Sequence, residues 1–336
     1  MKAIGYRKSL PIDHPLALEE FEMAAPEPRP TDIVVRVKAV SVNPVDTKIR
    51  ARRTPVEGKP EVLGWDAVGI VESVGPGASR FKIGDRVYYA GAIDRPGTNS
   101  ELHAVDERIV SRAPQSLNDE QAAALPLTSI TAYELLFDRL RIPKNGGAGQ
   151  TLLVIGGGGG VGSMLIQLAR QLTQLRVVAT ASRPDTQQWC FDLGAQSVID
   201  HSKSITDQLE AAGFGQVDFV AALTQTQQHY DQIVESLKPQ GHLAVIDDPD
   251  GLDVKKLKPK SLCLHWEFMF TRSLFQTPDM AEQGKLLAEI ASLVDTGRIR
   301  TTVNANFGSI NAENLRRAHA LIESGKARGK VVLAGF

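Results

Sequence analysis

A run of glycines between two strongly patterned segments is the feature that most constrains how this chain folds. Five glycines occupy positions 156–160, and Gly162 follows them after a single valine. The apolar segment Thr151–Ile155 precedes the run directly and is typical of a buried parallel strand. Residues 160–173 then place apolar side chains at helical spacing. The glycines therefore lie in a turn between a strand and a helix.

The alternation of strand and helix continues beyond the glycines. Strands are expected at 176–181, 198–199, 217–222 and 242–246, and helices at 184–193, 204–212 and 227–237. This repetition predicts a doubly wound parallel sheet. After residue 261 the pattern changes to an aromatic patch, two helices at 280–296 and 312–323, and a closing strand at 330–334.

The first third of the chain has a different pattern. Period-two alternation at 33–41 predicts a half-buried strand, and short apolar segments recur at 68–74 and 86–90. Glycines and prolines separate them, which indicates a compact, barrel-like β domain. A helical pattern follows at 122–137 and continues across Pro126. We therefore expect an α/β protein with two domains, in keeping with its 336 residues.

Charge and cysteine content exclude several classes of protein. The chain has 38 basic and 39 acidic residues, so it has no electrostatic reason to bind nucleic acid or an anionic membrane. No apolar run is long enough to cross a bilayer, and the N-terminus lacks the apolar core of a secretory signal. The two cysteines, Cys190 and Cys263, form neither a disulfide framework nor a four-thiolate zinc site. We therefore expect a cytoplasmic protein.

The glycine run contains the pattern G-x-G-x-x-G. In a strand-to-helix turn this pattern is typical of a dinucleotide site, because the backbone approaches the pyrophosphate and the helix N-terminus offers free N–H groups. A nucleoside-triphosphate loop is disfavoured, since no Lys-Ser or Lys-Thr pair follows the glycines. A flexible linker loop is the structural alternative. The expected cofactor-binding residues of the turn are Gly157, Gly159, Gly160, Val161 and Gly162.

The end of the second strand distinguishes between the two nicotinamide cofactors. An NAD site usually carries a carboxylate there, which binds the ribose 2′-OH. Here the strand ends in Ala181-Ser182-Arg183, without a carboxylate. Arg183 can pair with a 2′-phosphate and Ser182 can donate a hydrogen bond to it, which favours NADPH. Alternatively, Arg183 is a solvated turn residue.

Three segments resemble one enzyme family. Residues 156–170 (GGGGGVGSMLIQLAR), Asn43-Pro44-Val45-Asp46 and Gly329-Lys330-Val331-Val332 are similar to the medium-chain dehydrogenase/reductase superfamily, closest to its quinone oxidoreductase-like and "zinc-type alcohol dehydrogenase-like" branch. The resemblance implies a GroES-like β-rich catalytic domain formed by residues 1–124 and 263–336. It further implies a Rossmann dinucleotide-binding domain at 125–262 and a homodimer.

The resemblance also locates the positions at which the zinc enzymes of this family bind their catalytic metal. These positions carry Asn43, the pair Trp65-Asp66 after Gly64, and Leu127. Trp and Leu offer no ligand atom, and a catalytic zinc normally takes three protein ligands. We therefore expect no metal site.

The resemblance assigns roles to further residues. Asn43 would hold the substrate oxygen or the nicotinamide amide, or its side chain would instead cap the following turn. Lys48 stands at the position of the proton relay, where it is either a proton donor or a surface charge. Other cofactor contacts are expected from Thr128, which approaches the nicotinamide, from His201 near the 2′-phosphate, and from Lys330.

Aromatic residues are candidates for a substrate pocket. Trp65, Trp266 and Phe270 would stack on a flat acceptor, or would form the core of a domain junction. Without zinc, hydride transfer suits quinones and α,β-unsaturated carbonyl compounds, whose developing charge needs only hydrogen-bond donors and a proton. The expected activity is therefore an NADPH-dependent quinone or enone reductase. A metal-free carbonyl reductase or alcohol dehydrogenase, and a non-catalytic NADPH-binding protein of the crystallin or sensor type, remain alternatives.

Overall fold

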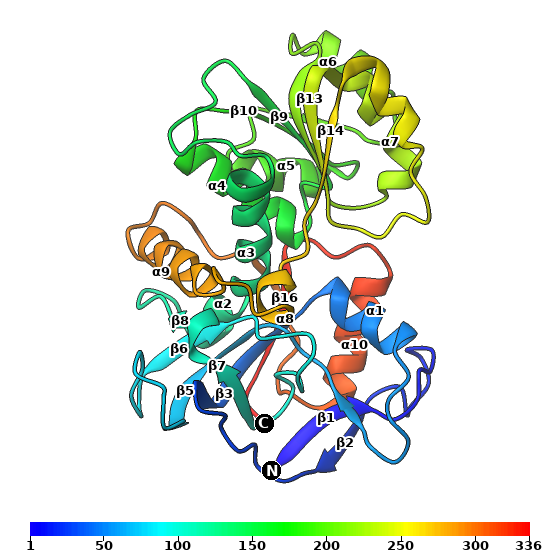
Figure 1. Ribbon diagram of the computed structural model, residues 1–336. Coiled ribbons are helices and arrows are strands. Elements are labelled where there is room, and N and C mark those ends of the chain that lie inside the picture. The colour runs from blue at the N-terminus through cyan, green and yellow to red at the C-terminus, as the bar shows by residue number, and fades with distance from the viewer. The chain divides into compact units, whose positions relative to one another are not determined.

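The computed structural model describes residues 1–336 as two compact units (Figure 1). The β-rich unit consists of Met1–Ile130 and Phe270–Phe336, and the parallel-sheet unit of Thr131–Met269. The predicted boundaries at 124/125 and 262/263 lie a few residues before these division points. No helix is both long enough and apolar enough to span a bilayer.

The parallel-sheet unit contains six strands in the order β11-β10-β9-β12-β13-β14. All neighbouring pairs are parallel, and the order reverses beside β9, as in a doubly wound sheet. The strands are β9 (Thr151–Ile155), β10 (Arg176–Thr180), β11 (Ser197–Ile199), β12 (Val217–Ala222), β13 (Leu237–Val245) and β14 (Cys263–Trp266). Every residue of β9 is buried, which explains its uninterrupted apolar pattern.

Helices cover this sheet where the sequence predicts them. They are α4 (Gly160–Leu172), α5 (Pro184–Asp192), α6 (Ile205–Ala211) and α7 (Thr226–Ser236), with a 3₁₀ segment η3 (Val254–Lys260) and a π-helical turn η2 (Leu135–Arg139). Leu209 of α6 and Ile233 of α7 pack into one core cluster with Leu153, Val220 and Leu243 of the sheet. The predicted doubly wound parallel sheet is therefore confirmed.

The β-rich unit is built on β3 (Asp32–Val42). The main sheet has the order β15-β16-β3-β5-β6-β8, with β7 also paired to β3, and a smaller sheet has the order β2-β1-β4. The other strands are β1 (Lys2–Tyr6), β2 (Glu19–Glu22), β4 (Glu61–Val62), β5 (Ala67–Val74), β6 (Arg86–Tyr89), β7 (Leu102–Asp106), β8 (Ser111–Arg112), β15 (Val303–Asn306) and β16 (Lys330–Ala334). Strand β16 runs antiparallel to β3, so the C-terminal tail completes the N-terminal sheet.

The helical segments of the β-rich unit differ in length, and α9, with 14 residues, is among the longest. They are α1 (Pro44–Arg52), η1 (Glu107–Ile109), α2 (Asp119–Ala123), α8 (Thr271–Leu274), α9 (Glu282–Asp295) and α10 (Ala312–Glu323), together with α3 (Pro126–Glu134), which crosses the division between the units. The single helix expected at 122–137 is wrong. The chain forms α2 and α3 instead, and Pro126 is the first residue of α3, because proline lacks an N–H group and suits a helix start.

Strand β14 is the most consequential element that the sequence pattern did not predict. The structure pairs it in parallel with β13 at the edge of the sheet, with Cys263 opposite His242 and His265 opposite Ala244. Its four residues, Cys-Leu-His-Trp, show neither a continuous apolar run nor clear alternation. The predicted boundary at 262/263 would separate β14 from the sheet to which it is hydrogen-bonded.

Candidate cofactor and active-site residues

The base of the glycine turn is tightly packed against neighbouring protein atoms, whereas the tip of the turn is open. Gly156 has a φ of +85°, which an L side chain disfavours. A Cβ on Gly162 would lie 2.5 Å from the carbonyl oxygen of Gly156, so α4 approaches the turn as closely as a glycine allows. A Cβ on Gly159 would meet only one atom, at 3.5 Å. The tip of the turn therefore leaves room for a ligand next to the backbone.

The first turn of α4 presents free donors beside that space. Gly160, Val161 and Gly162 are the first residues of the helix, and their N–H groups have no intrahelical acceptor. Gly159 precedes them and offers no side chain to cap them. Unpaired N–H groups and the positive end of the helix dipole favour an anion at this end. The turn thus fits the pyrophosphate of a dinucleotide.

Three further predicted cofactor residues follow the neighbouring strands. Ser182 and Arg183 come after β10, and His201 comes after β11. Since β9, β10 and β11 are adjacent and parallel, their carboxyl ends lie at one edge of the sheet, next to the glycine turn. The structure therefore brings these residues of the predicted cofactor set to the same edge.

Arg183 and His201, at this edge of the sheet, make weak contacts with other side chains. The Nε atom of Arg183 lies 3.4 Å from Asp185 in an exposed ion pair, which contributes little to stability. The ring of His201 meets that of His229 edge-to-face at 5.7 Å, and its buried Nδ1 has no hydrogen-bond partner. Burial and the nearby His201 lower the pKa of His229.

A buried polar cluster lies in the β-rich unit around Asp66; we call Ser41, Asn43, Asp66 and Lys330 the Asp66 cluster. One carboxylate oxygen of Asp66 accepts hydrogen bonds from Ser41 Oγ (2.6 Å), Asn43 Nδ2 (2.8 Å) and Lys330 Nζ (3.1 Å). The other accepts one from the backbone N–H of Leu127, at the start of α3 (2.8 Å). All four side chains of the cluster are buried. The Lys330 ammonium therefore compensates a buried negative charge.

The cluster gives Asn43 and Lys330 partners that the sequence did not predict. Lys330 Nζ donates to Asn43 Oδ1, to Asp66 and to the Val42 carbonyl, so its three protons all have acceptors within the protein. The Asn43 side chain bridges Asp66 and Lys330. The expected contacts of both residues with cofactor or substrate stay predictions; this geometry gives them a structural role.

Asp46 is a candidate functional residue that the sequence analysis mentioned only as part of a motif. It lies in the first turn of α1, is buried, and accepts the backbone N–H of Asn43 at 2.6 Å through Oδ2. Its Oδ1 atom has no partner. Burial raises the pKa of Asp46 to about 7; the Asn43 N–H and Lys330 oppose this shift, and Asp66 adds to it. A carboxyl group with such a pKa can store a proton near neutral pH.

Lys48 and Thr128 are two predicted site residues that lie on helices. Lys48 belongs to α1, as Asp46 does, and Thr128 follows Leu127 in α3. Lys48 is half-buried on α1, two residues after Asp46. Thr128 is buried in the first turn of α3, and its hydroxyl donates to the Leu125 carbonyl at 3.2 Å. Their roles as proton donor and nicotinamide contact stay predictions.

The predicted aromatic pocket residues divide between core and surface. Trp65 and Phe270 are both buried in the β-rich unit, with their rings edge-to-face at 6.1 Å. The indole N–H of Trp65 donates to the Ala92 carbonyl, so this pair behaves as core. Trp266 belongs to the parallel-sheet unit and is 54% exposed. A stacking role for these three residues stays a prediction.

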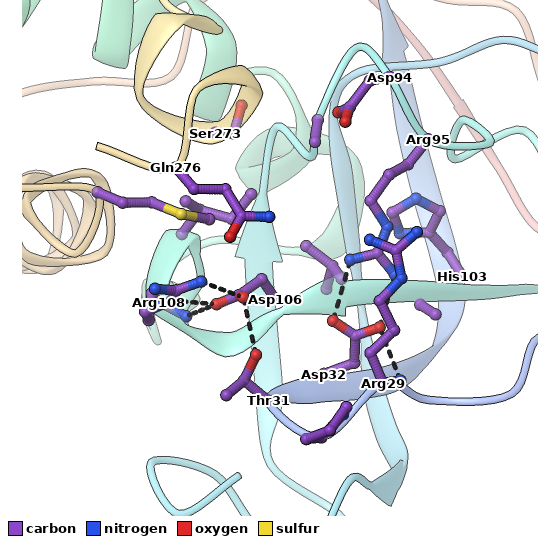
Figure 2. A pocket seen from close by; sticks show the side chains of 16 residues that line it. Arg29, Thr31, Asp32, Asp94, Arg95, His103, Asp106, Arg108, Ser273 and Gln276 are labelled. Carbon is purple, nitrogen blue, oxygen red and sulfur yellow. Dashed lines mark hydrogen bonds and ion pairs between the residues drawn. The ribbon is translucent and has the colours of Figure 1, made fainter. Parts of the chain in front are cut away.

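A pocket of about 240 Å³ in the β-rich unit contains none of the predicted site residues. Figure 2 shows two of its carboxylates already paired: Asp32 with Arg95, and Asp106 with Arg108 and the hydroxyl of Thr31. The buried His103 beside them has its pKa lowered to about 4, chiefly by burial. Ion pairs that are already satisfied favour a structural role here. The candidate cofactor site is the glycine turn of the parallel-sheet unit, and the candidate active-site residues are those around the Asp66 cluster of the β-rich unit.

Comparison with known proteins defines the family. Residues 29–115 match the alcohol dehydrogenase GroES-like domain, and residues 193–333 match a zinc-binding dehydrogenase family. A zinc-type alcohol dehydrogenase-like protein of Staphylococcus epidermidis is 39% identical over 336 residues, with 99% of both chains covered. The chain belongs to the medium-chain dehydrogenase/reductase superfamily. Its β-rich unit thus contains the GroES-like domain, and its parallel-sheet unit is Rossmann-like.

Solved structures of this superfamily share the fold over the whole chain. A protein from Rhizobium etli CFN 42 is 52% identical, with a TM-score of 0.96 over 100% of this chain and 98% of the other. The quinone oxidoreductase of Escherichia coli, solved in complex with NADPH, is 25% identical, with a TM-score of 0.84 over 99% of this chain and 100% of the other. The chain is therefore expected to work as an NAD(P)-dependent oxidoreductase.

The matched family is described as zinc-binding, which can be tested against the donor atoms of the Asp66 cluster. Lys330 Nζ is hydrogen-bonded to both Asn43 Oδ1 and Asp66 Oδ2, so an ammonium group lies between these oxygens. Neighbouring Trp65 and Leu127 provide no side-chain ligand. A catalytic zinc takes three ligands from His, Cys or carboxylate side chains. The cluster does not fit such an ion.

Proposed function

We propose that the chain is an NADPH-dependent, zinc-independent reductase that delivers hydride to quinones or α,β-unsaturated carbonyl compounds. The observation that carries the proposal is the open glycine turn at the start of α4, beside a strand end that has Arg183 and no carboxylate. The likeness to an NADPH-bound quinone oxidoreductase supports the choice of cofactor and acceptor.

The cofactor contacts follow from the edge of the parallel sheet. The N–H groups of Gly160, Val161 and Gly162 would bind the pyrophosphate, because they have no acceptor within α4. Arg183 would pair with the 2′-phosphate, with Ser182 as a second donor. His201, whose Nδ1 lacks a partner, would contribute a further contact. Bound NADPH supplies the hydride.

The protein must also deliver a proton to the reduced acceptor. Hydride addition to a quinone or an enone leaves a quinol anion or an enolate, which needs hydrogen-bond donors and one proton. We propose that Asp46 holds this proton. Since Oδ2 accepts the Asn43 N–H, the proton belongs on the unpartnered Oδ1, and the pKa of about 7 allows its release at neutral pH. Lys48 is the second candidate donor on the same helix.

Product analysis tests the reaction itself. Purified protein with NADPH would be offered a panel of quinones, enones and aldehydes, and the products of an enone would be identified. Loss of the C=C bond supports the proposal. Loss of the C=O bond would identify a carbonyl reductase, and NADPH binding without turnover across the panel would identify a non-catalytic binding protein. The homodimeric state and the cytoplasmic location stay predictions; light scattering of the purified protein tests the first.

A further inference from the structure

Three potential metal ligands meet at the edge of the parallel sheet. His242 belongs to β13, and Cys263 and His265 belong to the edge strand β14. His242 and Cys263 are direct partners across the two parallel strands. His265 lies two residues after Cys263, and alternate residues of a strand point to the same face. The pairing register therefore places all three side chains on one face of the sheet.

The distances between their ligand atoms are those of a single site. The ligand atoms of His242, Cys263 and His265 all lie within 4.8 Å of one another. Nδ1 of His242 and Nε2 of His265 are 3.0 Å apart, and the two rings stack with an interplanar angle of 14°. Two imidazoles bound at about 2.0–2.1 Å in a tetrahedral site have nitrogens about 3.3 Å apart. The two imidazoles are thus nearly in position without a metal.

The third ligand is able to complete the site. Cys263 is exposed, so its thiol can rotate toward the imidazoles without displacing packed side chains. The ring of Phe219 lies 5.7 Å from that of His242 and restricts the imidazole on its other side. Cys190, the other cysteine, is buried and belongs to α5. The cluster is therefore the one place in the chain where three or more His, Cys, Asp or Glu side chains meet at metal-binding distance.

We propose that His242, Cys263 and His265 bind one zinc-type divalent transition-metal ion, with a fourth position left open. Two imidazoles and a thiolate prefer zinc and the later transition metals to magnesium or calcium. On metal binding, the imidazole that now donates the N–H···N contact moves its proton to the ring nitrogen that faces away from the ion, and the Cys263 thiol releases its proton to solvent. The N–H···N contact is then replaced by two metal–nitrogen bonds. The thiolate offsets part of the positive charge of the ion, which the guanidinium of Arg141 near both rings otherwise opposes.

This inference departs from the expectation that the chain has no metal ligands. The expectation concerned the family positions around Asn43 and Trp65, which lie in the β-rich unit, whereas these ligands come from two strands of the parallel-sheet unit. The ion would join β14 to β13 through side chains and stabilise the edge of the sheet. Ligands that bind only the folded state raise its stability by mass action. The proposal does not depend on the function proposed above.

Cobalt is a direct probe of the site. Chelator-treated protein would be titrated with Co²⁺ and followed by absorption. We expect saturation at one ion per chain, a thiolate-to-cobalt charge-transfer band, d–d bands typical of tetrahedral coordination, and displacement by Zn²⁺. Cys263→Ser should lose the charge-transfer band. His265→Gln should weaken binding at least as much as the roughly 10–100-fold that loss of an outer-shell partner costs.

Matched controls separate this site from adventitious binding. Cys190→Ala should keep the charge-transfer band, and His14→Gln, which removes an exposed histidine of the β-rich unit, should keep the affinity. Thermal unfolding gives a second readout: Zn²⁺ should raise the Tm of the wild type and of both controls, but not that of Cys263→Ser. A charge-transfer band that survives Cys263→Ser, or a titration that shows no saturation at one ion per chain, would overturn the proposal.

Discussion

Lys330 Nζ donates a hydrogen bond to Asp66 Oδ2 over 3.1 Å, and both side chains are buried in the β-rich unit. Lys330 begins β16, the last strand of the chain, while Asp66 lies just before β5. The ion pair therefore links the C-terminal strand β16 to the segment before β5 in the N-terminal part of the unit. It also puts a fixed ammonium where the zinc enzymes of the family have their metal-ligand positions, as judged from the resemblance around Asn43.

Removal of this ammonium should destabilise the protein strongly. Lys330→Met leaves the Asp66 carboxylate buried without its cation, which costs about 3–5 kcal/mol in comparable pairs. Urea denaturation would measure the free energy of unfolding. Lys326→Ala, an exposed lysine in the same segment, should stay within about 0.5 kcal/mol of the wild type. In the double variant Asp66→Asn/Lys330→Met the loss should be smaller than in Lys330→Met; equal losses would contradict the pairing.

The raised pKa of Asp46 predicts a specific pH dependence of stability. The pKa of Asp46 is raised from 3.8 to about 7 by folding. Between about pH 4 and pH 7 the native state therefore still holds a proton that the unfolded state has already released. The contribution of this group to stability is thus fully present below pH 4 and is lost as the pH rises through 7. Asp46→Asn keeps an acceptor for the Asn43 N–H but cannot ionise. The stability of the wild type relative to Asp46→Asn should fall across this window, and a flat difference curve would refute the shift.

Arg183 should determine the preference for NADPH over NADH. Arg183→Ala removes a charge-assisted hydrogen bond worth about 1.5–3 kcal/mol, so the KM for NADPH should rise roughly 10–100-fold. The KM for NADH should stay the same, because NADH has no 2′-phosphate. Asp185→Asn removes the carboxylate that now pairs with Arg183 and should lower the KM for NADPH. Equal effects of Arg183→Ala on both cofactors would contradict the assignment.

Two glycines of the turn should respond differently to alanine. Gly162→Ala places a Cβ 2.5 Å from the Gly156 carbonyl oxygen, so the turn must move, and both the Tm and NADPH affinity should fall. At Gly159 the protein offers almost no obstacle to a Cβ, so Gly159→Ala should keep the Tm and lose only affinity. Differential scanning fluorimetry and a NADPH fluorescence titration separate the two effects. A Gly159→Ala variant with unchanged affinity would place the pyrophosphate elsewhere.

The parallel sheet could be predicted from the sequence because its signals are local. Thr151–Ile155 and Val217–Ala222 are buried central strands, and their apolar runs mark both ends correctly. The glycine turn follows from the same local pattern. Strand β14 escaped prediction because its identity depends on pairing with β13 rather than on its own four residues.

The candidate site was less predictable because its decisive contacts are distant in the sequence. Asp66 and Lys330 are 264 residues apart, and nothing in either segment indicates that they meet. Asp46 was visible as part of an Asn-Pro-Val-Asp motif, and the spacing from Asn43 matches a capping pattern. Its raised pKa, however, depends on burial, which a motif does not report. His242 and Cys263 likewise become neighbours only through the register of two strands.

The most direct test of the account is turnover by protein that has been freed of metal. The protein would be treated with a chelator, checked by elemental analysis, and assayed for NADPH oxidation with a benzoquinone, before and after addition of Zn²⁺. The account predicts the same rate in the metal-free and the untreated protein, and a higher kcat/KM with NADPH than with NADH. Activity that disappears with the metal and returns with Zn²⁺ would contradict it.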